Sequence, residues 1–577
     1  MISICAPFLF KVFFEGLFVH INQIVGYLVW MICLLGTCQF ASANDGTQEH
    51  LLTGDSIPET ELNNTKQDIS FTIKSWSFEG VKAFSPKELI KQVKDFDKKE
   101  IRFDDLSDIV ASIEGFYESQ GRIASVTIPP QDVTKGQLLV SVVEAKVGHV
   151  KIEKSGTSRV SHKKIKSTIG SYLPKGSIYD AESLNRGLLL ADDLPGGSMT
   201  GFLQAGEQDD EVDLILKTSQ EPPFIGDLGI DNAHARSLGT YRATMAVSLV
   251  SPFHLGETIG LQTLKSEGSR YGRFSLGMPL GSRGLRMSVY GSKLGYNVIT
   301  DELAALDIEG EVDELGLTLR YPLIRSRKGN LYSTYKLDHR VYLSSVAQVV
   351  QKHYSIDGIS LNLSGNFFDM IWGGGGNSAS LGVLHGRVSA KDSTLMNEGY
   401  HSLFKYSVSR QQTISEKLSL FVSLSGQITQ DVSTSSLHSI NKDSNQVGKV
   451  EDFLDSAESF SLGGMNGVRA YPSGEATGSE GRLFSGEFRY LLGPDLIVKA
   501  LYDWGWVGSR DPTTIGPSEY EISGAGLNAV WSAPLGFNLQ ATYARRFGEN
   551  PNPSATGMDQ DGSLKEDRLW VVLGRSF

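Results

Sequence analysis

Cysteine is nearly absent from this chain of 577 residues, since its three cysteines, Cys5, Cys33 and Cys38, all lie within the first forty positions. If that segment is removed, the remaining chain contains no cysteine, which excludes disulfides, thiolate metal sites and cysteine nucleophiles together. Positive charge is also scarce, because 54 lysines and arginines face 66 aspartates and glutamates and give a formal net charge of −12. Without a surplus of cations to neutralise phosphates, nucleic acid is not expected as a partner.

Motifs for catalysis and metal binding are missing as well. The eleven histidines show no metal-ligand spacing such as H-E-x-x-H, and the G-x-S-x-G pattern of serine hydrolases does not occur. The glycines from Gly463 onward do not lead from a strand into a helix, so they do not favour a phosphate-binding loop. We therefore predict that the protein is not an enzyme and has no catalytic residue, no cofactor and no metal site.

Long apolar runs are confined to the N-terminal segment. Residues 21–35 are apolar, and Ala41-Ser42-Ala43 matches the small-x-small pattern of a signal-peptide cleavage site. We predict that residues 1–43 are a secretory signal, and lipidation at Cys38 is a weaker alternative. No later run approaches the roughly 18 residues that a membrane helix requires. An exported chain of this kind can span a membrane only as a β-barrel.

Two small α+β modules are predicted after a polar tail. Residues 44–69 are polar and aperiodic, with Pro58 in the middle, so a stable helix that plugs a barrel is not expected there. The element order β-α-α-β-β is then predicted twice, over residues 70–148 and again over residues 149–222. In the first module Ser85-Pro86-Lys87-Glu88 has the pattern of a capping box with proline at the first helical position, which marks a helix start.

The strands of these modules are predicted from the alternation of apolar and polar residues. One continuous strand is expected over residues 71–79 and another over residues 137–147. The second module is expected to begin with a strand over residues 150–153. Small open sheets leave an edge strand free, and such an edge can accept an extended segment of another chain.

Residues 223–577 lose helical periodicity and show segments of about ten alternating residues, separated by Gly, Asn, Asp, Ser and Pro. A water-soluble β-sandwich gives the same alternation strand by strand, but its repetition over about 350 residues behind a signal peptide favours a transmembrane β-barrel. At roughly 22 residues for each strand and its connection, the region holds about sixteen strands. The final residue, Phe577, shares one alternating face with Leu569, Val571 and Leu573.

Residues 460–481 interrupt this alternation with a glycine-rich loop whose one cation is Arg469, within Val468-Arg469-Ala470-Tyr471-Pro472. A long glycine-rich connection is either disordered or folded back for a function. In the alternating segment over residues 496–506, Asp503 lies on the face opposite the aromatic residues and is predicted to point into the lumen. Because an acidic side chain inside a barrel needs a partner and a guanidinium fits a carboxylate, we predict that Arg469 pairs with Asp503. The alternative is an arginine on an external loop and a solvated aspartate.

Several of these motifs resemble those of two-partner secretion transporters. Residues 121–131 (G-R-I-A-S-V-T-I-P-P-Q) and 136–144 resemble the first POTRA domain of that family, and residues 184–196 resemble the second. Val468-Arg469-Ala470-Tyr471 resembles the V-R-G-Y/F motif of the loop that folds into the barrel, and Tyr502-Asp503-Trp504-Gly505 resembles the strand motif that holds its arginine. The chain departs from the family pattern at Ala470, where glycine is usual.

The resemblance implies a role for each matching residue. Arg469 would anchor the loop with Asp503 as its lumen partner, and Phe577 would belong to the signal for barrel assembly. The loop motif would consist of Gly463, Gly464, Val468, Ala470 and Tyr471. The expected fold is mainly β, with a transmembrane barrel of about sixteen strands preceded by two periplasmic α+β POTRA domains.

The function that the resemblance implies is secretion of a partner exoprotein of the haemolysin, haemagglutinin or adhesin type from the periplasm to the cell surface by two-partner (type V) secretion. The expected partners are an unfolded exoprotein with an N-terminal secretion domain bound by the POTRA domains, outer-membrane lipid, and the barrel assembly machinery during biogenesis. A barrel assembly factor of the same superfamily is an alternative, although such factors usually carry a different number of POTRA domains. A passive porin is a weaker alternative, because it needs neither the modules nor the inward loop.

Overall fold

The computed structural model describes residues 70–153, 158–391, 399–430, 454, 456–509, 517–554 and 556–577. The predicted secretory signal and the tail over residues 44–69, with its expected lack of a plug helix, lie outside these residues. Residues Asp68–Phe577 belong to one compact unit. Among the described residues, no helix is both long and apolar enough to cross a membrane.

The first N-terminal module contains a three-stranded sheet in the order β2-β5-β4 and a two-stranded sheet of β1 and β3. Its elements are β1 (Ser70–Thr72), β2 (Ser75–Glu79), α2 (Pro86–Gln92), the 3-10 helix η1 (Lys94–Phe96), β3 (Glu100–Arg102), α3 (Asp105–Ser119), β4 (Ala124–Thr127) and β5 (Gln137–Glu144). The predicted capping box is present at the start of α2.

The continuous strand expected over residues 71–79 is wrong, because the chain changes its pairing partner in the middle. β1 pairs with β3, whereas β2 pairs with β5 in parallel. At the break the N–H groups of Lys74 and Ser75 both donate to the carbonyl of Gly136, at 2.7 and 3.1 Å. Alternation continues through this break, so the sequence pattern does not reveal it.

The core of the first module contains a buried tyrosine bonded to a buried carboxylate. Tyr117 on α3 donates from its hydroxyl to Oε1 of Glu144 at 2.9 Å. The same oxygen accepts the N–H groups of Lys82 and Ala83 at 3.0 and 2.8 Å. Burial, together with this bond to Glu144, raises the pKa of Tyr117 well above its usual value, so the hydroxyl remains a donor. The network joins α3 to the end of β5 and to the loop after β2.

The second module repeats this layout with the sheet order β6-β8-β7. Its elements are β6 (Lys146–Ile152), α4 (His162–Gly170), α5 (Ala181–Asp192), β7 (Gly197–Ala205) and β8 (Glu211–Gln220). β6 runs parallel to β8, and β7 runs antiparallel to it. Asp180 caps α5, because its carboxylate accepts the N–H of Ser183 at 2.8 Å.

The strand expected over residues 137–147 ends earlier than predicted, and the next begins before residue 150. β5 ends at Glu144 and β6 begins at Lys146, so Ala145 is the single residue between the modules. Its N–H donates to Ile123 in the first module at 2.9 Å, and its carbonyl accepts from Tyr179 in the second at 2.8 Å. Because the apolar alternation runs on through this residue, the change of sheet leaves no mark on the sequence.

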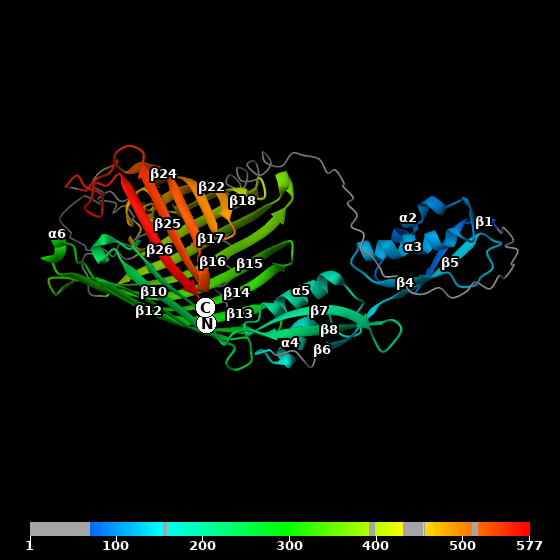
Figure 1. The fold of residues 1–577 in the computed structure, drawn as a ribbon. Coiled ribbons are helices and arrows are strands. Elements are labelled where there is room, and N and C mark those ends of the chain that lie inside the picture. Colours follow the sequence, from blue (N-terminus) through cyan, green and yellow to red (C-terminus); the bar gives the residue numbers. More distant parts are fainter. Residues whose placement is uncertain are drawn as a thin grey trace, which may run out of the picture. The chain divides into compact units, whose positions relative to one another are not determined.

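The barrel is a closed antiparallel sheet of sixteen strands, in which β26 returns to pair with β9 (Figure 1). The strands are β9 (Phe224–Asp231), β10 (Arg242–Val250), β11 (Thr258–Ser266), β12 (Ser269–Leu280), β13 (Leu285–Asn297), β14 (Ile308–Arg325), β15 (Gly329–Val346), β16 (Val349–Asp369), β17 (Gly375–Ala390), β18 (Gly399–Thr413), β19 (Leu418–Gln430), β22 (Glu480–Gly493), β23 (Leu496–Gly508), β24 (Glu519–Ser532), β25 (Phe537–Arg546) and β26 (Asp567–Ser576). Short helices in its connections are η2 (Arg236–Leu238), α6 (Asp301–Ala304), η3 (Ile371–Gly373), η4 (Ser456–Glu458) and η5 (Pro534–Gly536). The predicted fold class and strand number are confirmed.

The side chains of the barrel strands alternate between an apolar outer face and a polar inner face. Large apolar residues that remain exposed on the outer face include Leu315, Tyr335, Leu337, Ile359, Phe488 and Leu527. On the inner face Lys336 lies 3.2 Å from both Glu314 and Asp338, and Tyr290 donates to Glu314 at 3.0 Å. An apolar exterior around a polar lumen is the pattern of a transmembrane barrel.

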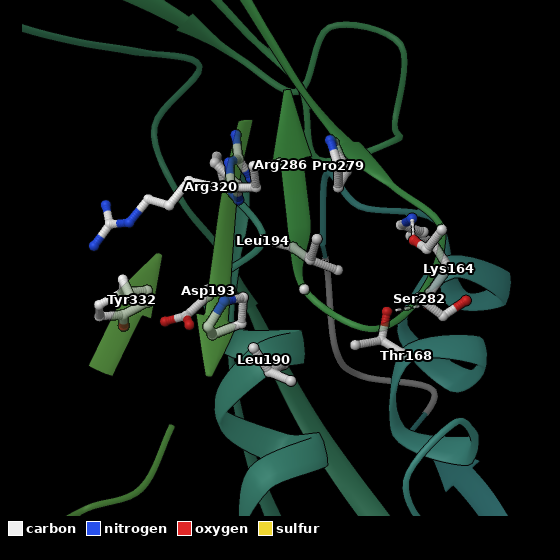
Figure 2. A pocket seen from close by; sticks show the side chains of 14 residues that line it. Lys164, Thr168, Leu190, Asp193, Leu194, Pro279, Ser282, Arg286, Arg320 and Tyr332 are labelled. Atoms are coloured by element: carbon white, nitrogen blue, oxygen red, sulfur yellow. Dashed lines mark hydrogen bonds between the residues drawn. The ribbon is translucent and has the colours of Figure 1, made fainter. Parts of the chain in front are cut away.

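The second module contacts the end of the barrel at which β14 ends and β15 begins, beside the residues drawn in Figure 2. Arg186 on α5 donates to the carbonyls of Pro322 and Leu323 in the β14 end at 2.7 and 3.1 Å. Arg325 forms a two-pronged pair with Asp193, at 2.7 and 2.8 Å. Ser171 at the end of α4 also donates to the carbonyl of Ser282 at 3.1 Å, so the helices of the second module lie against the β12–β13 and β14–β15 turns of the barrel.

Candidate functional site

The described residues before β22 fold back as a loop, and we call residues 460–481 the inward loop. Its ends form a short antiparallel pair, β20 (Phe460–Ser461) with β21 (Thr477–Gly478). Two glycines permit the turn between them. Gly464 has a φ of +110°, and a Cβ on Gly467 would lie 1.8 Å from the carbonyl oxygen of Leu462. Val468 then donates to that same carbonyl at 2.7 Å.

The inward loop is packed rather than solvated. Leu462, Val468, Ala470, Tyr471 and Ala476 are each at most 2% exposed. They form one apolar cluster with Val507, Ile522 and Ala544, on β23, β24 and β25 respectively. The loop therefore has its own core against the inner wall of the barrel.

Arg469 is held by two carboxylates on the inner wall. Its Nε and Nη2 donate to the two oxygens of Asp503 on β23, both at 2.8 Å, and its backbone N–H donates to the same carboxylate at 3.1 Å. Its Nη1 donates to Oε1 of Glu487 on β22 at 2.6 Å. Asp503 is 1% exposed and Arg469 is 8% exposed. A planar guanidinium that uses its fork in this way fixes the orientation of the loop as well as its position.

Further contacts complete the surroundings of this pair. Ser485 donates to Asp503 at 2.8 Å, and the indole of Trp570 donates to the carbonyl of Arg469 at 2.7 Å. Glu487 also forms an ion pair with Arg489 at 2.8 Å. The contacts of Arg469 thus reach three strands: β22 and β23, which follow the loop in the chain, and β26, the last strand of the barrel.

Ala470 stands where the family pattern has glycine, and the structure shows how it fits. Ala470 does not have a positive φ, so no backbone strain opposes a side chain there. Its methyl group lies over Gly524 on β24, where a built Cβ would approach it to 2.5 Å. The space that the side chain of Ala470 needs is therefore provided by a glycine on the barrel wall.

The start of the loop has a second ion pair, on another part of the wall. Glu458 in η4 pairs with Arg340 on β15, and Arg340 also pairs with Asp338 at 2.7 Å. The backbone carbonyl of Glu458 accepts from Gln427 on β19 at 2.8 Å. The segment that leads into the inward loop is thereby tied to β15 and β19, whereas Arg469 is tied to β22 and β23.

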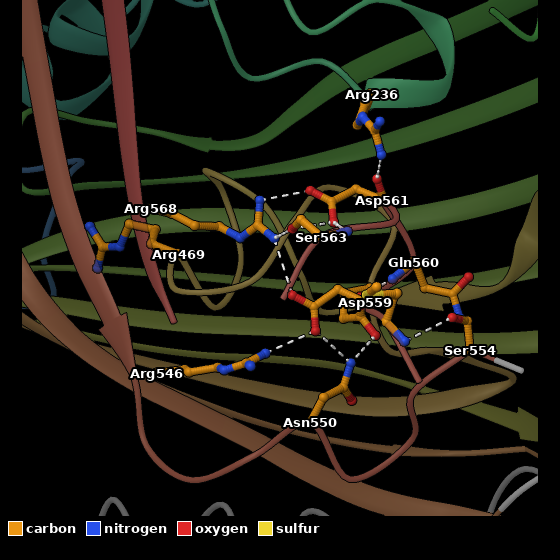
Figure 3. A network of polar contacts seen from close by, with 12 residues as sticks. Arg236, Arg469, Arg546, Asn550, Ser554, Asp559, Gln560, Asp561, Ser563 and Arg568 are labelled. Atoms are coloured by element: carbon orange, nitrogen blue, oxygen red, sulfur yellow. Dashed lines mark hydrogen bonds and ion pairs between the residues drawn. The ribbon is translucent and has the colours of Figure 1, made fainter. Parts of the chain in front are cut away.

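A third network joins the inward loop to the connection between β25 and β26 (Figure 3). Glu475 accepts from the side chain of Asn550 at 2.9 Å and from the backbone of Gln560 at 2.8 Å. In that connection Asp559 pairs with Arg546 at 2.8 Å and with Arg568 at 3.3 Å. The loop is consequently covered by a connection that is itself cross-linked by buried charges.

Sequence reasoning missed Glu487, Trp570 and the Glu458–Arg340 pair. Glu487 lies two positions after Ser485, on the same lumen face of β22, so the alternation contained a signal for it. Trp570 and Arg340 contact residues more than 100 positions away, and no local pattern reports such a pairing. Among the described parts of the chain, no group of three His, Cys, Asp or Glu side chains is placed to hold a metal ion.

Phe577 lies at the seam where the barrel closes. Its N–H and C=O exchange two hydrogen bonds with Gly226, both at 2.9 Å, and thus extend the pairing of β26 with β9. Its side chain is 52% exposed on the outer face. Its role in assembly stays a prediction.

A closed sixteen-stranded antiparallel barrel behind α+β POTRA-like sheets defines an outer-membrane β-barrel of the POTRA-bearing class. Residues 71–145 match the family described as POTRA domain, ShlB-type, and residues 210–529 match the family described as haemolysin secretion/activation protein ShlB/FhaC/HecB. The second match spans more than half of the chain. The chain therefore belongs to the ShlB/FhaC/HecB family of haemolysin secretion/activation proteins.

A relative is similar in sequence over most of the chain, and two solved structures share its fold. The heme/hemopexin transporter protein HuxB of Haemophilus influenzae is 21% identical over 506 residues, which cover 85% of this chain and 84% of that protein. CdiB from Escherichia coli has a TM-score of 0.69 at 16% identity, covering 90% of this chain and 93% of CdiB. CdiB from Acinetobacter baumannii has a TM-score of 0.65 at 18% identity, covering 96% and 97%.

The family assignment confirms the predicted function, its localisation and the prediction that the protein is not an enzyme. The chain is an outer-membrane transporter of the two-partner secretion type. The alternatives of a barrel assembly factor and a passive porin are not favoured, because the matched family is defined by secretion. BamA from Haemophilus ducreyi, lacking POTRA domains 1–3, shares the barrel fold with a TM-score of 0.51 at 13% identity, covering 88% of this chain and 100% of that chain.

Proposed function

We propose that this transporter captures its unfolded exoprotein on the free edge of β7 and passes it through the barrel beside the inward loop. β7 has a neighbouring strand, β8, on one side only. The C-terminal half of β7 carries two exposed apolar side chains, Phe202 at 46% and Leu203 at 36% exposure. An extended segment can add to such an edge through main-chain hydrogen bonds while its side chains contact these apolar groups.

The exported partner is a β-rich exoprotein of the haemolysin, haemagglutinin or adhesin type. The description of the family as haemolysin secretion/activation proteins supports this class. Its N-terminal secretion domain is the segment that binds the modules, because the N-terminus reaches the periplasm first. Folding of the exoprotein outside the cell then supplies the driving force, since a folded chain does not return through the pore.

In this proposal Arg469 sets the position of the inward loop along the route of the exported chain. The observation that carries the proposal is that the one cation of the loop is buried in the lumen and bonded to Asp503 and Glu487. The loop packs on β23, β24 and β25. The exported chain is thus directed toward the polar inner wall of β13, β14 and β15, where Glu314 and Lys336 lie.

The capture step is tested by placing a charge on the free edge. Phe202→Glu should reduce the amount of exoprotein in the medium at least about tenfold, because a charged carboxylate in place of the apolar ring opposes docking of an apolar segment. Phe103→Glu is the matched control, since Phe103 is 78% exposed in the first module and lies off its three-stranded sheet. Both variants should reach the outer membrane in equal amounts. Equal secretion by the two variants would refute capture at β7.

A further inference from the structure

A cavity of about 340 Å³ lies where the second module meets the rim of the barrel (Figure 2). Helix α4 contributes Lys164 and Thr168 to its lining, and helix α5 contributes Leu190. The barrel contributes Arg286 on β13 and Arg320 on β14. The cavity is therefore built jointly by the module that precedes the barrel and by the barrel itself.

The cavity collects positive charge without a matching negative charge. Asp193 is the one carboxylate among its described lining residues, and both its oxygens are taken by Arg325 at 2.7 and 2.8 Å. Among the described residues, no carboxylate lies within ion-pair distance of Lys164, Arg286 or Arg320. Three cations thus share one hollow with a single carboxylate, Asp193, which also attracts Arg286 but is already paired with Arg325, and the remaining positive charge is balanced by solvent or by an anion.

Each of these cations has a neutral partner that positions it. The amine of Lys164 donates to the carbonyl of Gly281 at 2.5 Å, and Nη1 of Arg286 donates to the carbonyl of Gly256 at 3.3 Å. The guanidinium of Arg320 lies 4.0 Å from the centre of the Tyr332 ring. Burial and the charge of Arg286 lower the pKa of Lys164, which agrees with a positive potential inside the cavity.

The two arginines point into the lumen rather than toward lipid. Arg286 and Arg320 face each other across the β13–β14 ladder, on the same side as Glu314. The intervening positions of β14 point outward, as the 62% exposure of Leu315 shows. The cavity therefore opens on the path from the second module into the barrel, and not on the surrounding membrane.

We propose that this cavity binds aspartate and glutamate side chains of the exported polypeptide as it passes from the second module into the lumen. The inference extends the proposed function and rests on it, because it takes the modules to be the entry side. Carboxylates fit the site because the two guanidiniums and the amine offer several donors around one hollow. The site holds acidic segments at the entrance and so selects for exported chains that carry them.

Direct binding to the whole transporter in detergent tests the proposal. The probe is a fluorescein-labelled peptide of twelve glutamates, and an equal peptide of twelve lysines serves as the charge control. We expect the glutamate peptide to bind in a salt-dependent way and the lysine peptide not to bind. The double substitution Arg286→Gln with Arg320→Gln should weaken binding about tenfold or more, since each removes a charge-assisted hydrogen bond.

Arg283→Gln is the matched control. Arg283 is exposed on the β12–β13 turn next to the cavity, and its backbone carbonyl, not its charge, is used by the second module. This variant should change the affinity less than about twofold. Correct folding of every variant is checked by its heat-modifiable migration as a closed barrel.

Two results would overturn the proposal. The first is no binding of the glutamate peptide, or equal affinity in the double variant and the wild type. The second is loss of peptide binding when phosphatidylglycerol is added to the micelles, with that lipid held by the same two arginines, which would assign the cavity to lipid headgroups. Because the assay does not involve secretion, failure here leaves capture at β7 untouched, and failed secretion by Phe202→Glu does not affect this result.

Discussion

Removal of Arg469 should release the inward loop without opening the barrel. In Arg469→Ala, Asp503 keeps only Ser485 and the backbone N–H of residue 469 as donors, whereas Glu487 keeps Arg489 at 2.8 Å. Asp503 is 1% exposed, so its charge is left almost uncompensated. Breaking a buried pair in this way costs about 3–5 kcal/mol. The cost falls on docking of the loop, because the strand ladders on either side do not depend on the side chain of Arg469.

Thiol labelling measures this release directly. Val468 is 0% exposed beside Arg469, so Val468→Cys in a background without the three native cysteines reports loop opening by its rate of reaction with a maleimide. A loss of about 3–5 kcal/mol raises that rate on the order of a hundredfold or more if opening precedes labelling. Arg489→Ala is the control, because Glu487 then still holds Arg469, and we expect less than about a tenfold change.

A second substitution separates loss of the pair from loss of packing. Arg469→Ala combined with Asp503→Asn should label more slowly than Arg469→Ala alone, because no uncompensated carboxylate is left in the wall. Labelling of Arg469→Ala within about threefold of the rate with Arg469 present would refute the anchor, since the loop would then be held by its apolar cluster alone.

Three further predictions concern other parts of the chain. Gly524→Ala should undock the loop, because its Cβ would meet the Cβ of Ala470 at 2.5 Å and the carbonyl oxygen of Arg545 at 2.7 Å; adding Ala470→Gly removes the first contact only and should restore slow thiol labelling in part. A hydrogen bond from Lys151, followed by one from the backbone N–H of His149, holds the pKa of Asp213 below its usual value. The stabilisation of the fold by Asp213 is therefore present above about pH 3.9, the pKa of an unfolded aspartate, and is lost as the pH falls through the pKa of the folded state. The protection factors of the amides in β6 and β8, which correct for the slower intrinsic exchange in acid, should therefore fall as the pH is lowered, and less so in Asp213→Asn, which is already destabilised at neutral pH; equal acid sensitivity would contradict this. Asp559→Ala should expose the β25–β26 connection to trypsin, because Arg546 and Arg568 lose the carboxylate that they share, and unchanged digestion would count against that network.

The architecture of the barrel was predictable because alternation is a local property that repeats. A residue such as Leu315 reports its outward position through its immediate neighbours, and sixteen repetitions of that pattern specify a closed sheet. The switch of sheets at Ala145 was not predictable, because apolar alternation is the same on either side of a change in hydrogen-bond partner. The break between β1 and β2 was missed for the same reason.

The anchor of the loop could be anticipated only in part. Arg469 stood out because it is the one cation in the glycine-rich loop. Asp503 stood out because it is an acidic residue on the inward face of a strand whose other face is aromatic. Glu487 shares the same guanidinium but looks like any other charged residue on an alternating strand. The space for Ala470 depends on Gly524, which lies 54 positions away, and only tertiary structure reveals such a fit.

Secretion of the partner is the most direct test of the whole account. The transporter and its partner exoprotein are produced together in a Gram-negative host, and the exoprotein is measured in the medium and in the periplasm. We predict that the exoprotein reaches the medium with the wild-type transporter and stays in the periplasm both without it and with Arg469→Ala, although that variant is inserted in the membrane. Exoprotein in the medium without the transporter, or equal secretion by Arg469→Ala, would contradict the account.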